Sequence, residues 1–227
     1  PVGLAAARAT IIAALRRGAF HRAIDLTRGG HAEAARDWLQ IRDFRQSTRF
    51  TRVGTGATDA LIELAAGETT PEEAVLQVRK DLLDTYQSRL GTNKAEAEQA
   101  ADREFPERLA ETAAIVDGYW QILEGEYRKQ RGEAATTRAN RNFARLATSA
   151  ARTDLSAFRA AARATAADLD GFVAAPFTDE ELARRAAQLT RFLDLIPVEY
   201  NDGTDDGRVT IPFELQEATA FHEGVEQ

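Results

Sequence analysis

The segment from Thr178 to Pro197 most strongly constrains the fold, because it specifies both where a helix begins and which of its faces is apolar. Thr178 and Glu181 have the spacing of a capping box, in which the two side chains accept hydrogen bonds from backbone amides that the first helical turn leaves unpaired. The apolar residues that follow recur at steps of four, three, four and three: Leu182, Ala186, Leu189, Leu193 and Ile196. This spacing predicts one buried face, and Pro197 is expected to end the helix.

The residues after Pro197 predict a small β-hairpin followed by a closing helix. Val198–Tyr200 and Arg208–Ile211 flank a segment rich in Asn, Asp and Gly, which is typical of two short strands joined by a tight turn. Pro212 suits the first position of a helix, and Gly224 is expected just past its end.

The rest of the chain is also predicted to be helical. Thr70 and Pro71 begin a helix that is expected to end at Gly91, and a core helix centred on Trp120 is expected to end at Gly132. The first 28 residues predict a helical hairpin that turns near Gly18. The sequence therefore predicts an all-α fold, a mostly antiparallel helical bundle with one small β-hairpin near the C-terminus. It forms a single domain over 1–227, or two lobes over 1–91 and 92–227.

Composition excludes several classes of function. The chain has 227 residues with a formal net charge of −7, which argues against general binding to nucleic acid, because the phosphates must be met by a cationic surface. It contains no cysteine, which excludes disulfides, thiolate metal sites and cysteine nucleophiles. No nucleophile elbow and no phosphate-binding glycine loop is present, so we do not expect an enzyme. Cations are the partners that best match this charge.

Two groups of acidic residues are candidates for binding a metal. Glu104, Glu107 and Glu111 have helical spacings of three and four, which allows their carboxylates to converge on a hard cation. The other group lies on the closing helix and consists of Glu214, Glu217 and His222. Oxygen and imidazole ligands suit iron, although Glu217 lacks the His three positions later that helical di-iron bundles use. Both groups can equally be solvated acids on helix surfaces.

The acidic loop before the closing helix offers an alternative cation site. Asp202, Asp205 and Asp206 lie in this loop, and part of the spacing resembles an EF-hand calcium loop. The bidentate Glu is one residue late, at Glu214, and extended segments are expected in place of the flanking helices. A plain hairpin turn explains the same residues.

A cluster of arginines provides a candidate docking surface. Arg42, Arg45 and Arg49 are three or four residues apart and lie among aromatic side chains. Arginines with this spacing can bind an acidic group of a partner protein or a lipid phosphate. They can also pair with acids of the same chain.

Four segments, in the same order, resemble the extracytoplasmic region that precedes the membrane part of bacterial high-affinity iron permeases. They are AARDWLQIRDFRQSTRF (Ala34–Phe50), VRKDLLDTYQSRL (Val78–Leu90), DGYWQILEGEYRKQRG (Asp117–Gly132) and LIPVEYNDGTDDGRVTIPFELQEATAF. The resemblance implies an extracytoplasmic domain, tethered to a membrane permease part that follows Gln227, which captures or relays iron or gates its entry.

The resemblance also draws attention to residues 103–107, whose sequence Arg-Glu-Phe-Pro-Glu satisfies the Arg-Glu-x-x-Glu pattern with which iron permeases hold iron inside the membrane. Here the flanking residues are polar and Pro106 interrupts the helix, unlike the apolar membrane helix of the family pattern. Two alternatives remain open: a helical scaffold that docks a partner protein and binds no metal, and an envelope protein that binds Ca²⁺ at the acidic loop.

Overall fold

The computed structural model describes residues 1–43 and 56–226, except for the side chains of 184, 185, 188 and 223–226. The chain divides into two compact units on either side of the Ala175–Pro176 bond. We call residues 1–43 and 56–175 unit 1, and residues 176–226 unit 2. The lobe boundary expected after residue 91 lies inside a continuous helix, so the division falls elsewhere.

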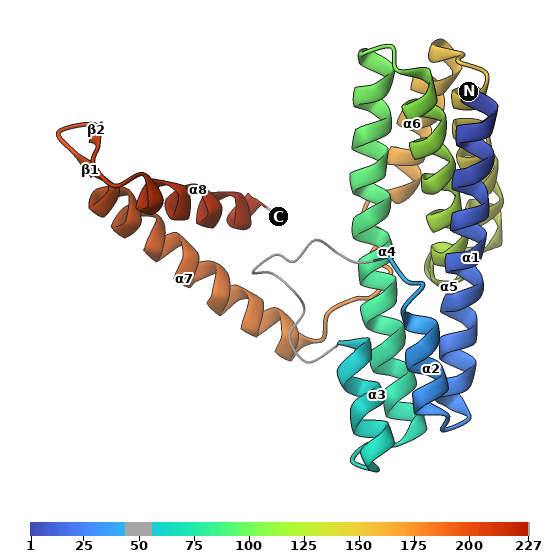
Figure 1. Ribbon diagram of the computed structural model, residues 1–227, viewed down its shortest axis with the longest axis horizontal. Coiled ribbons are helices and arrows are strands. Elements are labelled where there is room, and N and C mark those ends of the chain that lie inside the picture. The colour runs from blue at the N-terminus through green and yellow to red at the C-terminus, as the bar shows by residue number, and fades with distance from the viewer. Residues whose placement is uncertain (44–55, 227) are drawn as a thin grey trace. The chain divides into compact units, whose positions relative to one another are not determined.

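Unit 1 is a bundle of six helices, of which α1, α4 and α5 are the longest (Figure 1). They are α1 (Val2–Arg28), α2 (Ala32–Leu39), α3 (Ala57–Ala66), α4 (Pro71–Asp102), α5 (Pro106–Ala151) and α6 (Leu155–Leu169). The Thr70 capping box is present as predicted, and Gly67 ends α3 in the left-handed conformation. The predicted breaks at Gly18 and Gly91 are wrong, because α1 and α4 continue through both glycines.

The helix α5 folds back on itself at Gly132, where φ is 79° and ψ is 172°. Trp120 stacks on Phe143 with ring centroids 4.5 Å apart, and its Nε1 donates to Asn140 Oδ1 at 2.7 Å. Residues 20 positions apart on one straight helix would be about 30 Å apart. The two halves of α5 are therefore antiparallel, and the predicted helix end at Gly132 is confirmed.

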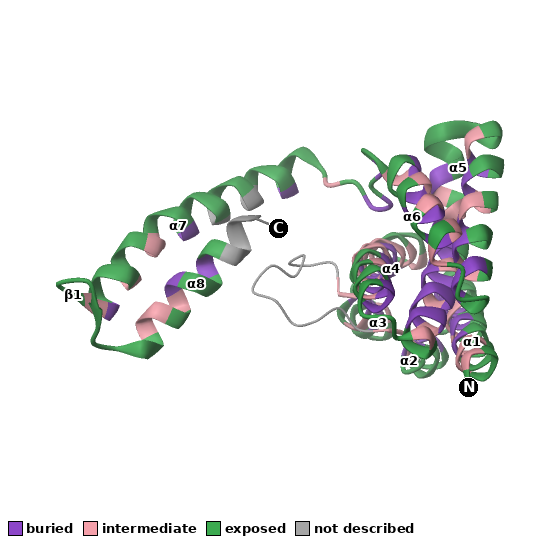
Figure 2. Ribbon diagram, turned by 90° about the horizontal axis from the view of Figure 1, so that it is seen from above, coloured by how far each residue is buried: buried purple, intermediate pink, exposed green. Residues whose placement is uncertain are grey.

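The core of unit 1 is built mainly from leucine, alanine and aromatic side chains of α1, α4 and α5, with further residues from α2, α3 and α6. Figure 2 shows the buried parts of these helices in purple. Phe20 packs edge-on against Tyr86, which in turn contacts Tyr119. At Gly118 the backbones of α1 and α5 approach so closely that an added Cβ would lie 2.2 Å from the Cβ of Ala13. The packing of these two helices thus requires the absence of a side chain at this position.

Asp43 joins three helices of unit 1 through its carboxylate. Arg89 Nε donates to Asp43 Oδ2 at 3.0 Å, the Tyr119 hydroxyl donates to the same oxygen, and Arg16 lies 3.4 Å from it. Burial alone would raise the pKa of Asp43, but these contacts outweigh it and hold the pKa below its ordinary value. The segment that follows α2 is therefore fixed to α1, α4 and α5 by one carboxylate.

Unit 2 is a helical hairpin of α7 (Asp179–Gly203) and α8 (Pro212–Glu226), joined by strands β1 (Thr204–Asp205) and β2 (Arg208–Val209). The Thr178 capping box begins α7 as predicted. The expected helix end at Pro197 is wrong, since α7 continues through it. Val198–Tyr200 are consequently helical rather than extended, and the antiparallel pairs are Thr204 with Val209 and Asp205 with Arg208.

The expected burial of the apolar face of α7 is also not observed. Leu182, Leu189 and Leu193 are 51%, 40% and 50% exposed, respectively. The helix α8 packs instead against the neighbouring face of α7, where Phe192 stacks on Phe221 with ring centroids 5.3 Å apart. The two helices of unit 2 thus leave uncovered the face that the sequence predicts to be buried.

The contact at Gly118 predicts opposite effects for two substitutions in one helix. Gly118→Ala should lower the stability of unit 1 by about 1–3 kcal/mol, because overpacking forces α1 away from α5. Gly125→Ala is the matched control: it lies in the same helix with open space around the added Cβ, so stability should rise by up to about 1 kcal/mol. Urea unfolding followed by tryptophan fluorescence measures both, and equal effects would contradict the close approach.

The Asp43 contacts predict a loss of stability in acid. A carboxylate whose pKa is lower in the folded state stabilises the fold above the pKa of the unfolded chain, near 4, and this contribution disappears as the pH falls below it. Asp43→Asn should reduce stability at pH 7 by about 1–3 kcal/mol, because it leaves its donors poorly paired. Asp25→Asn, which removes an exposed pair with Arg28, should change it by less than about 0.5 kcal/mol. Unfolding titrations from pH 3 to 7 measure the stability of all three proteins. The difference in stability between the unmodified chain and Asp43→Asn should shrink toward pH 3.

Candidate functional site

Three glutamates of unit 2 bring their carboxylates together at the hairpin end of α7 and α8. Glu199 comes from α7, and Glu214 and Glu217 come from the first turns of α8. One oxygen of each lies within 4.8 Å of the others, and all three residues are half-buried. Within the described residues, this is the only such group of three or more acidic or histidine side chains. We call it the acidic triad.

The local fold around Gly203 explains how residues from two helices meet. The carbonyl of Gly203 accepts hydrogen bonds from the amides of Thr210 at 2.9 Å and Ile211 at 3.2 Å, which close the hairpin. A Cβ at Gly203 would lie 2.9 Å from the backbone nitrogen of Leu215. A glycine here therefore allows the first turn of α8 to approach the end of α7, which places Glu214 beside Glu199.

The electrostatics of the acidic triad oppose full ionisation. A hydrogen bond with Glu214 raises the pKa of Glu199, and desolvation and the charges of Glu214, Glu217 and Asp202 raise it further. One proton held between Glu199 and Glu214 is therefore more favourable than two ionised carboxylates side by side. A bound cation would replace that proton and remove the repulsion.

Carboxylate oxygens at this separation are suited to a hard cation. Metal ions of this kind take about six oxygen ligands, and water commonly supplies those that the protein does not. Three carboxylates from two helices can provide half of such a set. Iron accepts oxygen ligands of this type, as do other divalent metals.

The sequence identified two members of the triad and missed the third. Glu214 and Glu217 were candidates, and the structure brings them together. Glu199 was missed because the expected helix end at Pro197 placed it in a strand. The sequence does contain an indication that the helix continues past Pro197 and includes Glu199. Tyr200 lies four residues after Ile196 and continues the apolar spacing of α7 beyond the proline. His222 is exposed on α8 and is not part of the triad.

The structure does not bring Glu104, Glu107 and Glu111 together as a metal-binding group. Glu104 has φ 55° in the turn between α4 and α5, and Glu107 lies in the first turn of α5. Glu111 forms ion pairs with Arg8 at 3.2 Å and Arg108 at 3.3 Å. The predicted metal site requires all three glutamates to lie on one helix. Because α5 begins only at Pro106, Glu104 lies outside that helix.

The acidic loop is a hairpin turn. Asp206 and Gly207 both have positive φ, 46° and 72°, which is the geometry of the two-residue type I′ turn favoured by Asp-Gly. Asp205 belongs to β1, and Asp202 lies in the last turn of α7, where its charge acts on Glu199. Turn geometry accounts for the Asp-Gly pair, and calcium binding there stays a prediction.

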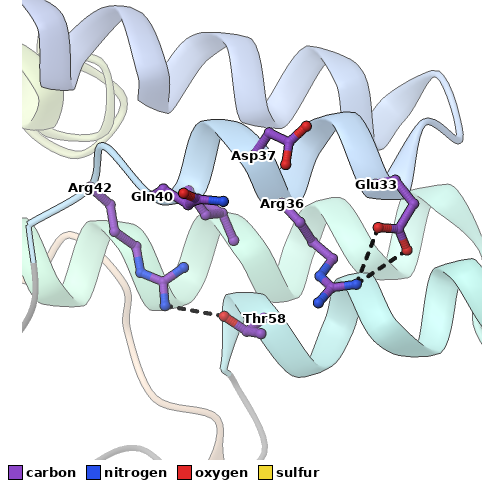
Figure 3. Close-up of a pocket in the computed structure, with 7 residues that line it drawn as sticks. Glu33, Arg36, Asp37, Gln40, Arg42 and Thr58 are labelled. Atoms are coloured by element: carbon purple, nitrogen blue, oxygen red, sulfur yellow. Dashed lines mark hydrogen bonds and ion pairs between the residues drawn. The ribbon is translucent and has the colours of Figure 1, made fainter.

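The candidate docking arginines are only partly within the described residues. Arg42 lines an open cavity of about 280 Å³ between α2 and α3 and donates to the Thr58 hydroxyl at 3.1 Å (Figure 3). Arg36 lines the same cavity and pairs with Glu33 at 3.2 Å. Arg45 and Arg49 lie outside the described residues, so their role in docking remains a prediction.

Comparison with protein families gave two matches that together span most of the chain. Residues 1–168 match the iron permease FTR1 N-terminal domain, and residues 176–227 match the iron permease-associated 4-helix bundle domain. The chain belongs to the iron permease FTR1 family. The boundary between the matches lies where the structure divides into units 1 and 2. Neither the comparison with curated proteins nor that with solved structures gave a match.

The FTR1 family is one of transporters rather than enzymes, and its description implies iron as the transported substrate. None of the described helices combines the length and the apolar character that a membrane-spanning segment requires. The Arg-Glu-x-x-Glu pattern at residues 103–107 runs from the end of α4 through a turn into α5. The iron-permease relationship therefore rests on the whole chain and not on this pattern.

The raised pKa of Glu199 predicts that this residue destabilises the metal-free protein near neutral pH. A carboxyl whose pKa is higher in the folded state stabilises the fold while it is protonated, and this contribution is lost as the pH rises through the folded pKa. Glu199→Gln should therefore raise the melting temperature at pH 7, with the gain disappearing in acid. Asp194→Asn removes an exposed charge from the same helix and should have little effect. Thermal unfolding at several pH values measures these changes. A lower melting temperature for Glu199→Gln at pH 7 would contradict the inferred repulsion between Glu199 and the neighbouring carboxylates.

Proposed function

We propose that this chain is the extracytoplasmic part of an FTR1-family permease, and that the acidic triad captures iron and relays it toward the transport pathway. The observation that carries the proposal is the convergence of Glu199, Glu214 and Glu217 in a chain that belongs to an iron permease family. The extracytoplasmic position is supported by the sequence resemblance described above. Iron enters this proposal as the transported substrate.

The chemistry of the triad is suited to transient binding. Three protein carboxylates leave about half of the coordination positions of a hard cation to water, so iron can exchange at the triad. The triad residues are half-buried rather than enclosed, which keeps the ion accessible from solution. These properties favour capture and transfer over permanent storage.

The position of the triad, between two helices, would also allow bound iron to gate iron entry. Glu199 lies near the end of α7, and Glu214 lies at the start of α8. An ion bound between them would join the two helices and remove the carboxylate repulsion, which stabilises the hairpin in the iron-bound state. Iron occupancy would thereby alter the stability of the end of unit 2.

Metal titration of the whole chain tests the proposal. Ferrous iron, added anaerobically to metal-free protein, should release or absorb heat and raise the melting temperature of unit 2, because a ligand that binds only the native state stabilises it. At 100 times the dissociation constant the gain is about 2.7 kcal/mol. The double variant Glu214→Gln/Glu217→Gln should lose both the heat and the stabilisation.

The matched control is Glu104→Gln/Glu107→Gln, which removes the same number of charges from unit 1 and should bind iron like the unmodified chain. Loss of binding in the control and not in the triad variant would place the site in unit 1 and overturn the assignment. Unmodified chain that shows neither heat nor stabilisation in excess iron would overturn iron capture altogether.

A further inference from the structure

The second half of α5, after the reversal at Gly132, carries a row of arginines on one face. They are Arg138, Arg141, Arg145 and Arg152, at steps of three, four and seven. At about 100° per residue, these positions fall within about 60° of one another around the helix axis, and all four residues are exposed. Arg152 directly follows α5, but its backbone is still helical, and its amide donates to the carbonyl of residue 148 at 3.2 Å. We call these four residues the arginine stripe.

The arginine stripe lies on the side of α5 away from the core of unit 1. The buried apolar side chains of the same part of the helix are Ala139, Phe143, Leu146 and Ala150. Their mean direction around the helix is about 140° from that of the arginine stripe. The stripe therefore faces solvent, and packing of unit 1 does not explain it.

Acidic residues of the chain neutralise little of this charge. Arg138 pairs with Asp168 at 2.9 Å. Within the described residues, the guanidinium groups of Arg141, Arg145 and Arg152 form no ion pair and no hydrogen bond. Residues 134–167 contain six arginines, no lysine and one acidic residue, although the whole chain has a formal net charge of −7. Like charges three or four positions apart repel one another on a helix, so the stripe does not stabilise α5.

The surface around the arginine stripe lacks the apolar side chains that protein interfaces use. Such interfaces are enriched in aromatic residues and methionine, and a few buried large side chains supply most of the binding energy. Within the described residues, none of the exposed large apolar side chains lies between 134 and 167. The exposed neighbours of the arginines are small, namely Thr137, Ala144, Thr148 and Ala151. A surface with charge and without apolar anchors suits an array of phosphates.

We infer that the arginine stripe binds the surface of an anionic phospholipid membrane, with the second half of α5 lying along the headgroups. The stripe is about 21 Å long, so it can contact several phosphates at once. Acidic residues elsewhere on the chain are screened beyond about 10 Å. Membership of a permease family supports a position beside a membrane. The inference does not depend on iron binding, because the stripe lies in unit 1 and the acidic triad in unit 2.

Vesicle flotation of the whole chain tests the binding. In about 50 mM salt, the unmodified chain should float with vesicles of phosphatidylglycerol and phosphatidylcholine and not with vesicles of phosphatidylcholine alone, and about 500 mM salt should release it. Arg141→Gln/Arg145→Gln/Arg152→Gln should weaken binding by about 100-fold, because each arginine near an anionic surface contributes a factor of about five. Lysine at the same three positions keeps the charge and should retain the binding.

The matched control is Arg22→Gln/Arg103→Gln/Arg208→Gln. It removes the same charge from three exposed arginines whose guanidinium groups are also without an ion pair in the described part of the chain, and it should float like the unmodified chain. Glu214→Gln/Glu217→Gln should float normally as well, so failure of iron binding would leave this test intact. Three results would overturn the inference: no flotation of the unmodified chain, equal losses in the stripe variant and the control, or tighter binding to polyglutamate or duplex DNA than to the vesicles.

Discussion

The close approach of α1 and α5 at Gly118 is the contact on which unit 1 depends most. Because no side chain separates the helices there, α1 lies near enough for Phe20 to reach Tyr86 and for Arg16 to reach Tyr119. Tyr119 then orients its hydroxyl toward Asp43, which fixes the chain after α2. A wider spacing of α1 and α5 would weaken the aromatic core and the polar contacts together.

Local sequence signals predicted the helix starts better than the helix ends. The capping boxes at Thr70 and Thr178 need only residues within one turn, and both form as predicted. Gly18 and Gly91 do not end their helices, because glycine inside a helix costs only about 1 kcal/mol and packing of the flanking turns outweighs it. Pro197 is exposed, so the carbonyl it leaves unpaired can be solvated and α7 continues.

The candidate site was harder to predict, because it depends on tertiary structure. Spacing alone placed Glu214 and Glu217 on one helix, but Glu199 joins them only through the hairpin that returns α8 to the end of α7. Spacing also grouped Glu104 with Glu107 and Glu111, although the positive φ of Glu104 places it in a turn. A periodic pattern is informative within a helix and loses its meaning once the helix ends.

The environment of Glu199 in unit 2 differs from that of two acidic residues of unit 1, Glu126 and Asp43. Burial would raise the pKa of Glu126 in unit 1, but Arg79 and Lys129 outweigh it and hold the pKa below its ordinary value. Asp43 is held low in the same way by Tyr119, Arg16 and Arg89. In unit 2, other acids raise the pKa of Glu199 instead. Glu126 and Asp43 thus have cationic partners within unit 1, whereas burial raises the pKa of Asp81 and Asp117 in the same unit. At the acidic triad the pKa of Glu199 is raised mainly by other carboxyl groups, so a cation bound there would relieve a repulsion that burial alone does not cause.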